Sequence, residues 1–403
     1  MHAVVLGDSP VRLWGLTPGE RIARQLRSQK IEPWTASIES LPPDSALLLL
    51  RGDFLYDDRV IRGMAKAPHG VLGVDADGAT VAVAARVAAK DASRAIEQLR
   101  GGHLPAAGSG VGMLTIAQVA QGFEMGLRKL DLPYVLRVTA ERRSALEQLT
   151  FAGAYKGVTD LVTKWLWPAP ARRVTRWCAE LGITPNQVTA MSLVLVVVVL
   201  ALFAHGEYAW GLAAGWVMTF LDTVDGKLAR VTVTSSQLGN IFDHGIDLVH
   251  PPLWYVAWGM GLAPVAAEIY GLTLPSLYAI IFIGYIGGRL CEGAFQLWIA
   301  RFSIFTWRPF DSYFRLIVAR RNPSMILLTT SLVAGRPDLG LLAVAAWHAL
   351  SLAILLVRLL QGAGVRLGGS PVRSWLTEIG ETVDGRALAV RLFTHARSVP
   401  RQA

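Results

Sequence analysis

Residues 220–249 read FLDTVDGKLARVTVTSSQLGNIFDHGIDLV and place four aspartates in two pairs. Asp222 and Asp225 are three residues apart, and Asp243 and Asp247 are four apart, so each pair lies on one face of a helix. The first pair ends one apolar run and the second pair begins the next. Two adjacent antiparallel helices would therefore bring four carboxylates together at one depth, near the cytoplasmic side of a membrane.

Carboxylates gathered in an apolar setting need a counter-charge. Ionised groups near a bilayer are costly unless they are paired or bound to a cation. Oxygen ligands without histidine or cysteine favour Mg²⁺, Mn²⁺ or Ca²⁺ over zinc, and two such ions can neutralise a diphosphate and orient a nucleophile. The alternative is the ion-coupling site of a transporter, which predicts mid-membrane charges and inverted repeats that the sequence does not show.

The spacing of this segment is D-x-x-D-G-x-x-A-R, eight residues, then G-x-x-x-D-x-x-x-D. It resembles the signature of the CDP-alcohol phosphotransferase (CDP-alcohol phosphatidyltransferase) family, with every position present and a fit over residues 156–361. The segment ITPNQVT ahead of the first apolar run is similar to the family's Pro-Asn-x-x-Thr element, here Pro185, Asn186 and Thr189. The positions that match the signature are Asp222, Asp225, Gly226, Ala229, Arg230, Gly239, Asp243 and Asp247.

The resemblance implies a reaction. A CDP-alcohol, either CDP-diacylglycerol or a CDP-polyol, donates its phosphoryl-alcohol group to an acceptor hydroxyl and releases CMP, in phospholipid or polar head-group biosynthesis. It also implies two Mg²⁺ or Mn²⁺ ions on Asp222, Asp225 and Asp243, with Asp247 completing the cluster and acting as general base. Members of the family are often dimers, so a homodimer is expected. The residues expected to contact CDP are Gly226, Ala229, Arg230 and Gly239, with Asn186 and Thr189 nearby.

A basic patch leads into the fifth apolar run. Arg315, Arg320 and Arg321 are spaced so that all three can face the mouth of a cavity, and arginine forks suit phosphate oxygens. In family members that use phosphorylated polyols, arginines near this region bind the acceptor phosphate. We therefore expect the patch to hold the acceptor or the donor head group. The alternative is that these residues only set topology, because basic residues gather at cytoplasmic membrane boundaries.

Composition agrees with a membrane enzyme. Hydrophobic residues make up 52% and charged residues 17% of the 403-residue chain, against about 25% charged in an average soluble domain. A disordered chain, a coiled coil and a collagen-like repeat are excluded. The net charge of +9 suits an anionic membrane surface, a phosphate-rich substrate or nucleic acid. The signature selects membrane lipids, a CDP-alcohol donor and a hydroxyl acceptor as partners, and not nucleic acid. Two distant cysteines support neither a disulfide framework nor a zinc site.

The expected fold class is an α-helical integral membrane bundle of six transmembrane helices, preceded by an interfacial helix and by an N-terminal soluble α/β domain. No signal peptide is recognised, and the Lys and Arg bias of the loops places both termini of a multi-pass protein in the cytoplasm; if the protein is bacterial, the membrane is the cell inner membrane. The predicted spans are 187–206, 208–225, 240–263, 275–299, 323–336 and 339–361. The predicted domains are 1–150 (α/β), 151–186 (linker and interfacial amphipathic helix), 187–361 (transmembrane) and 362–403 (basic cytoplasmic tail).

Residues 1–150 alternate strand-like and helix-like patterns, which favours an α/β sandwich with a mainly parallel sheet. The region weakly resembles the sugar-phosphate nucleotidyltransferase fold, in which Arg12 and Asp53 could match the family's arginine and metal-binding aspartate. Of the glycine-rich loop only Gly7 remains, and the expected lysine is missing. A non-catalytic domain is therefore predicted. The alternative is a bifunctional enzyme whose N-terminal domain makes the CDP-alcohol, such as CDP-inositol.

Overall fold

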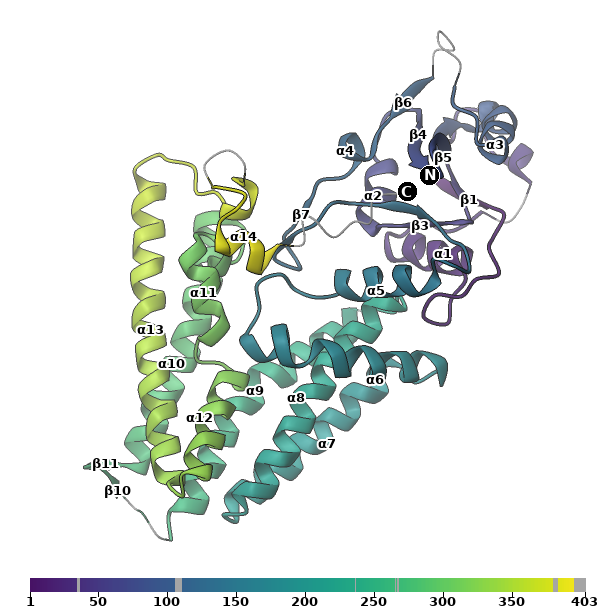
Figure 1. Ribbon diagram of the computed structural model, residues 1–403. Helices are drawn as coiled ribbons and strands as arrows, with labels where there is room; N and C mark the ends of the chain where they lie inside the picture. The colour runs from purple at the N-terminus through teal and green to yellow at the C-terminus, as the bar shows by residue number, and fades with distance from the viewer. Residues whose placement is uncertain are drawn as a thin grey trace.

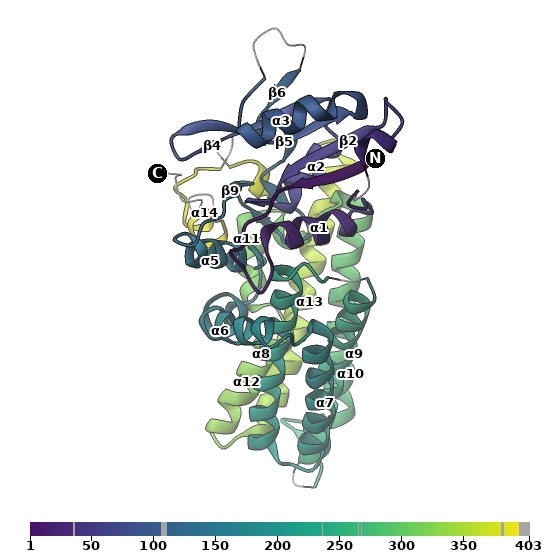
Figure 2. The same ribbon diagram turned by 90° about the vertical axis from the view of Figure 1, so that its right-hand side faces the viewer.

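The computed structural model describes residues 1–34, 37–105, 111–235, 237–264, 266, 268–379 and 383–394. It contains an N-terminal α/β domain seated at one end of a long helical bundle (Figure 1). Helices α1 and α5 lie between the sheet and the end of the bundle (Figure 2). The expected combination of an α/β region with a mainly helical region is confirmed.

The N-terminal sheet has five strands in the order β1-β2-β5-β4-β6. Its pairings are two parallel (β1 with β2, β4 with β6) and two antiparallel (β2 with β5, β5 with β4), so the expectation of a mainly parallel sheet is wrong. The reason lies at Asp77 and Gly78, which both have positive φ and form a tight hairpin turn that returns the chain antiparallel. The strands are β1 (His2–Leu6), β2 (Ala46–Arg51), β4 (Gly70–Ala76), β5 (Ala79–Ala88) and β6 (Gly112–Leu114).

Both faces of this sheet are covered. Strand β2 sends Leu48 and Leu50 into a core shared with α1 (Pro18–Ser28) and α2 (Asp58–Met64). It sends Leu47 and Leu49 into a second core against α3 (Ala92–Gly101), and all four leucines are fully buried. The period-2 alternation of side chains thus explains the continuous leucine run. The remaining small elements of the domain are α4 (Ile116–Val119), two 3₁₀ turns (Ile38–Ser40 and Ala89–Asp91), and the strand pairs β3 (Phe54–Tyr56) with β9 (Val135–Arg137) and β7 (Phe123–Glu124) with β8 (Lys129–Leu130).

The α/β domain and the bundle share one apolar cluster. Trp14 and Phe151 stack within it, and Val224 and Leu228 enter it from the bundle. The connecting segment contains α5 (Arg143–Gly153), a π-helical turn (Val162–Leu166) and α6 (Pro168–Glu180). Helix α6 forms where the interfacial helix was expected, and it exposes Trp177 while burying Cys178. Its location in a membrane interface stays a prediction.

All six predicted apolar runs are helical, but six membrane spans are not confirmed. Three helices of the described chain are long and apolar enough to cross a membrane: α7 (Pro185–Ala204), α10 (Leu274–Ala294, continued by a π-helical turn to Ala300) and α13 (Pro337–Leu367). Helix α12 (Arg321–Val333) has 13 residues, about 20 Å at 1.5 Å per residue, which is short of a hydrocarbon core of about 30 Å. Helices α8 (Tyr208–Val231) and α9 (Gln237–Leu262) carry the charged signature residues at one end.

Shorter elements complete the bundle. Part of the predicted tail packs against it, because Trp375 is fully buried and its indole N–H donates to the Ser312 hydroxyl at 2.9 Å. The short helix α14 also packs on α11, at the same end of the bundle as the α/β domain (Figure 1). These elements are α11 (Pro309–Ile317), α14 (Leu388–Phe393), the 3₁₀ turns Ile304–Thr306 and Trp375–Thr377, and the pair β10 (Glu268–Ile269) with β11 (Leu272–Thr273).

Candidate active site

Two of the signature aspartates meet across neighbouring elements. Asp222 in α8 and Asp247 in α9 each form an ion pair with the same guanidinium, that of Arg321, at 2.5 and 2.6 Å. Their side chains differ in exposure, 16% for Asp222 and 40% for Asp247. Asp247 is therefore the carboxylate of this pair that is more open to a substrate. The side chain of Asp243 lies outside the described residues.

Asp225 is anchored by the helix before it. The hydroxyl of Thr189 in α7 donates to Asp225 Oδ2 at 2.7 Å, and Asp225 is 4% exposed. Helix α7 begins with Pro185 in its first turn and a capping box from Thr184, which sets the position of Thr189 one turn later. The Pro-Asn-x-x-Thr element thus reaches the aspartate cluster through its threonine, whereas Asn186 is exposed.

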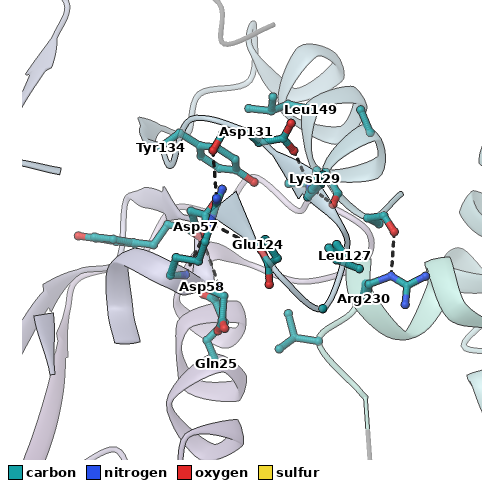
Figure 3. A pocket seen from close by; sticks show the side chains of 18 of the residues that line it. Gln25, Asp57, Asp58, Glu124, Leu127, Lys129, Asp131, Tyr134, Leu149 and Arg230 are labelled. Carbon is teal, nitrogen blue, oxygen red and sulfur yellow. Dashed lines mark hydrogen bonds and ion pairs between the residues drawn. The ribbon is translucent and has the colours of Figure 1, made fainter. Parts of the chain in front are cut away.

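The other signature positions lie on the same two helices. Gly226 and Ala229 are partly buried in α8, and Gly239 lies in the first turn of α9. Arg230 Nε donates to the carbonyl of Ala154 at 2.8 Å, so this arginine also holds the connecting segment (Figure 3).

A polar cavity of about 170 Å³ opens beside Asp222 and Asp247. Arg315, Arg320 and Arg321 all line it, so the structure brings the predicted basic patch next to the aspartates. Arg320 forms an ion pair with Glu292. Arg315 is 7% exposed, and its Nε and Nη1 have no hydrogen-bond partner among the described residues. The full lining is Arg128, Lys156, Thr159, Asp160, Thr163, Asp222, Thr223, Lys227, Asp247, Pro251, Arg289, Arg315, Arg320, Arg321 and Asn322.

Sequence reasoning missed several of these residues. Arg128 comes from the turn of the β7–β8 hairpin and Lys156 from the connecting segment. Lys227 occupies an unspecified position of the signature, and its ammonium lies 3.9 Å from the centre of the Tyr155 ring. Asp160 accepts a hydrogen bond from Asn322 at 2.9 Å. Of these four residues, only Lys227 lies within the sequence signature, where it follows Gly226.

The cavity is electropositive, and this shifts the ionisation of its neighbours. Burial lowers the pKa of Lys156 to about 8, and the positive charges of Arg128, Arg230 and Arg315 add to the effect. Burial acts to raise the pKa of Asp160, but Arg315 and the hydrogen bonds that Asp160 accepts hold that pKa below its ordinary value. Positive charge therefore contributes to both pKa shifts, and burial is the main cause of the shift at Lys156.

A second, larger cavity of about 510 Å³ lies between the α/β domain and α8 (Figure 3). Acidic and basic side chains face it, among them Asp57, Glu124 and Lys129, and Arg230 reaches it from α8. Lys156 lines both cavities, so the two spaces adjoin at this residue.

The N-terminal residues considered for nucleotide chemistry are engaged locally. Arg12 forms an ion pair with Glu20 at 3.1 Å, and Asp53 forms one with Arg51 at 2.7 Å. Gly7 has a positive φ at the end of β1. A catalytic role of this domain stays untested.

The aspartates suit a hard divalent cation by their chemistry. Within the described part of the chain, no three acidic, histidine or cysteine side chains gather as a metal-binding group. However, Asp222, Asp225 and Asp247 offer carboxylate oxygens from two helices that both pack against α7, and the guanidinium of Arg321 bridges Asp222 and Asp247. The donor set therefore fits Mg²⁺ or Mn²⁺.

Comparison with known proteins finds a family whose model matches part of this chain. Residues 182–309 match the family model described as CDP-alcohol phosphatidyltransferase. The matched region contains all four aspartates, Thr189 and Arg230, whereas the arginine patch follows it and Arg128 precedes it.

Several curated proteins are similar to part of this chain. Cholinephosphotransferase 1 of Danio rerio is 28% identical over 123 residues, covering 28% of this chain and 31% of the relative. Phosphatidylinositol phosphate synthase of Mycobacteroides abscessus is 32% identical over 115 residues (27% and 50%). Archaetidylinositol phosphate synthase of Pyrococcus horikoshii is 35% identical over 79 residues (19% and 42%). The chain spans about a third to a half of the length of these relatives.

Proposed function

We propose that the protein is a membrane-bound CDP-alcohol phosphotransferase that transfers the phosphoryl-alcohol group of a CDP-alcohol to an acceptor hydroxyl and releases CMP. The observation that carries this proposal is the pairing of Asp222 and Asp247 across α8 and α9, beside a cationic cavity, within the matched domain. Phosphoryl transfer depends mainly on positioning and on neutralising charge, and this arrangement offers both.

Asp247 is the proposed general base. It takes the proton of the acceptor hydroxyl while the acceptor oxygen bonds to the phosphorus that carries the alcohol, and the bond from that phosphorus to CMP breaks. Its carboxylate is the more exposed of the Arg321-bound pair, and it lines the cavity. The Tyr285 hydroxyl donates to the Asp247 main-chain carbonyl at 3.1 Å, which fixes this part of α9.

Asp222, Asp225, Asp243 and Asp247 would hold two Mg²⁺ or Mn²⁺ ions. When bound, the ions supply neutralisation of the donor diphosphate. Gly226, Ala229, Arg230 and Gly239, with Asn186 and Thr189, are the proposed contacts of CDP. Among these, Thr189 orients Asp225 through its hydroxyl.

The arginine patch is proposed to bind a phosphate on one substrate. Arg315 supports this role most strongly, because its buried guanidinium has N–H groups with no partner among the residues that the structure describes, which is costly unless an anion reaches it. Two relatives are named as synthases of a phosphatidylinositol phosphate and an archaetidylinositol phosphate, names that contain a phosphate on the product head group.

A homodimer with both termini in the cytoplasm completes the proposal. The proposal that both termini lie on the same side of the membrane is supported by the position of α14 and the α/β domain at the same end of the bundle (Figure 1). The exposed apolar side chains of α7, such as Val194 and Val197, suit contact with lipid.

The test is product analysis with the purified full chain in detergent. A panel of CDP-alcohols and hydroxyl acceptors is incubated with Mg²⁺, and CMP and the new phosphodiester are followed by mass spectrometry. The expected result is CMP release that requires both substrates and is lost in Asp247→Asn. Absence of CMP with every pair of substrates would refute the proposed reaction.

A further inference from the structure

The β7–β8 hairpin joins the α/β domain to the polar cavity of the bundle. Its two short strands pair antiparallel, and Phe123 packs against the apolar cluster that contains Phe305 and Trp375 of the bundle. Its turn ends at Arg128, whose N–H donates to the carbonyl of Met125 at 3.2 Å. The hairpin therefore belongs to the α/β domain in sequence and touches the bundle in space.

The position of Arg128 is fixed by the connecting segment. Gly157 N–H donates to the Leu127 carbonyl at 3.0 Å, and Val158 N–H donates to the Arg128 carbonyl at 3.2 Å. A side chain at Gly157 would place a Cβ 2.8 Å from the Arg128 carbonyl oxygen, so only glycine allows this approach. Arg128 itself has a φ of +49°, an unusual conformation for arginine that persists where the surroundings hold it.

The guanidinium of Arg128 faces the cavity without a counter-charge of its own. Neither a hydrogen bond nor an ion pair joins its side chain to any residue that the structure describes. The nearby acids are engaged elsewhere, Glu292 with Arg320 and Asp160 with Asn322. Burial and the positive charge of Arg320 lower the pKa of Arg128 to about 10, which reports the crowding of like charges.

Two arginines that form no ion pair with any described residue thus line one small cavity from different parts of the chain. Arg315 enters from α11 and Arg128 from the α/β domain. The volume of about 170 Å³ is below the roughly 300–1,000 Å³ of pockets that enclose whole small molecules. It suits a phosphate group with part of a polyol, while the adjoining cavity of about 510 Å³ suits a larger group. Because Asp247 lines the same small cavity, a hydroxyl of this ligand can reach the base.

We propose that the α/β domain completes the acceptor site, with Arg128 of the hairpin binding a phosphate monoester on the acceptor whose hydroxyl lies at Asp247. This inference rests on the proposed function. It gives the α/β domain a role in substrate specificity that needs no chemistry of its own.

Kinetics with paired acceptors test it on the full chain. The acceptors are inositol 1-phosphate and glycerol 3-phosphate, each compared with the unphosphorylated polyol, with CDP-diacylglycerol as donor. Arg128→Ala is expected to raise the apparent KM for the phosphorylated acceptor roughly 10- to 100-fold, the loss of a hydrogen bond to a charged group, with the donor KM unchanged. Arg128→Lys should recover part of the affinity because it keeps the charge. Met125→Ala, at the exposed tip of the same hairpin, is the matched control and should match the wild type.

A second measurement does not depend on turnover. Inorganic phosphate should raise the thermal midpoint of the wild type and of Met125→Ala, and much less that of Arg128→Ala. Equal KM changes for phosphorylated and unphosphorylated acceptors, a change confined to the donor, or equal stabilisation by phosphate in all variants would overturn the inference. If the wild type releases no CMP with any acceptor, the proposed function itself fails. An active wild type with an unaffected Arg128→Ala variant removes only the role of the hairpin.

Discussion

Arg321 offers a sharp test of the aspartate cluster, because its single guanidinium forms ion pairs with two carboxylates. The change Arg321→Gln removes the charge and leaves Asp222 and Asp247 facing each other. Removing one partner of a buried ion pair costs about 3–5 kcal/mol. Asp247 is 40% exposed, so water partly screens its charge and the loss of stability comes mainly from Asp222. We therefore expect a loss at the lower end of this range, about 3 kcal/mol. At about 2–4 °C per kcal/mol, the apparent Tm in EDTA should fall by about 6–12 °C.

Divalent metal should reverse this loss, because it can neutralise the same oxygens. A ligand at 100 times its Kd stabilises by about 2.7 kcal/mol, which is close to the predicted deficit. In the wild type Mg²⁺ competes with Arg321 for the carboxylates, so its stabilising effect should be smaller. The assay is thermal unfolding of the purified full chain in detergent, followed by tryptophan fluorescence, in EDTA and across a Mg²⁺ titration.

The matched control is Arg320→Gln. Arg320 is paired with Glu292 and lies next to Arg321 in sequence, so this variant should also lose stability but should gain no extra benefit from Mg²⁺. Adding Asp225→Ala to Arg321→Gln should remove the recovery. An Arg321→Gln variant that melts with the wild type in EDTA, or that responds to Mg²⁺ no more than Arg320→Gln, would refute the reasoning.

Three further outcomes are expected. Asp225→Ala should lower CMP release by at least about two orders of magnitude, because it removes a metal ligand, and near wild-type turnover would contradict that assignment. Asp247→Asn should lose roughly 10²–10⁴-fold in kcat while retaining donor affinity, measured by donor binding; parallel loss of both would make Asp247 mainly a ligand. Lys156 lines the cavity and is charged below its pKa of about 8, so its attraction for an anionic acceptor, and with it kcat/KM, should fall as pH rises through that value. Lys156→Arg should stay flat to pH 9, and a flat wild-type profile would show that Lys156 does not attract the acceptor.

The sequence predicted the parts of the site that follow helical spacing. Asp222 and Asp225 lie one turn apart in α8, and Thr189 reaches Asp225 from the element predicted beside it. Spacing within a helix determines which side chains share a face, so these relations could be derived from the chain alone. The placement of Arg321 between Asp222 and Asp247 joins residues 99 and 74 positions apart, and it depends on how α12 packs against α8.

Hydropathy located six helices but did not determine how many could cross a membrane. The apolar pattern is carried by α7, α10 and α13, whereas α8 and α9 give part of their length to the charged site. In the α/β domain, the alternation of strand-like and helix-like segments favours parallel strands, whereas the Asp77-Gly78 turn pairs β4 and β5 antiparallel. In both cases a few residues, the charged signature positions in α8 and α9 and the Asp77-Gly78 turn, decide the structure against the general pattern of the segment around them.

Arg128 could not have been found from the sequence, because its role depends on how two domains meet. That meeting is fixed at the end of α8, the helix that carries Asp222 and Asp225. Arg21 of the α/β domain donates to the carbonyl of Val231 at 2.6 Å, where the free carbonyls of a helix end attract positive charge. Arg230 donates in the other direction, to the connecting segment two residues before Lys156. The helix that carries Asp222 and Asp225 therefore also contacts the α/β domain that carries Arg128, which ties one part of the carboxylate cluster to one of the cavity's arginines.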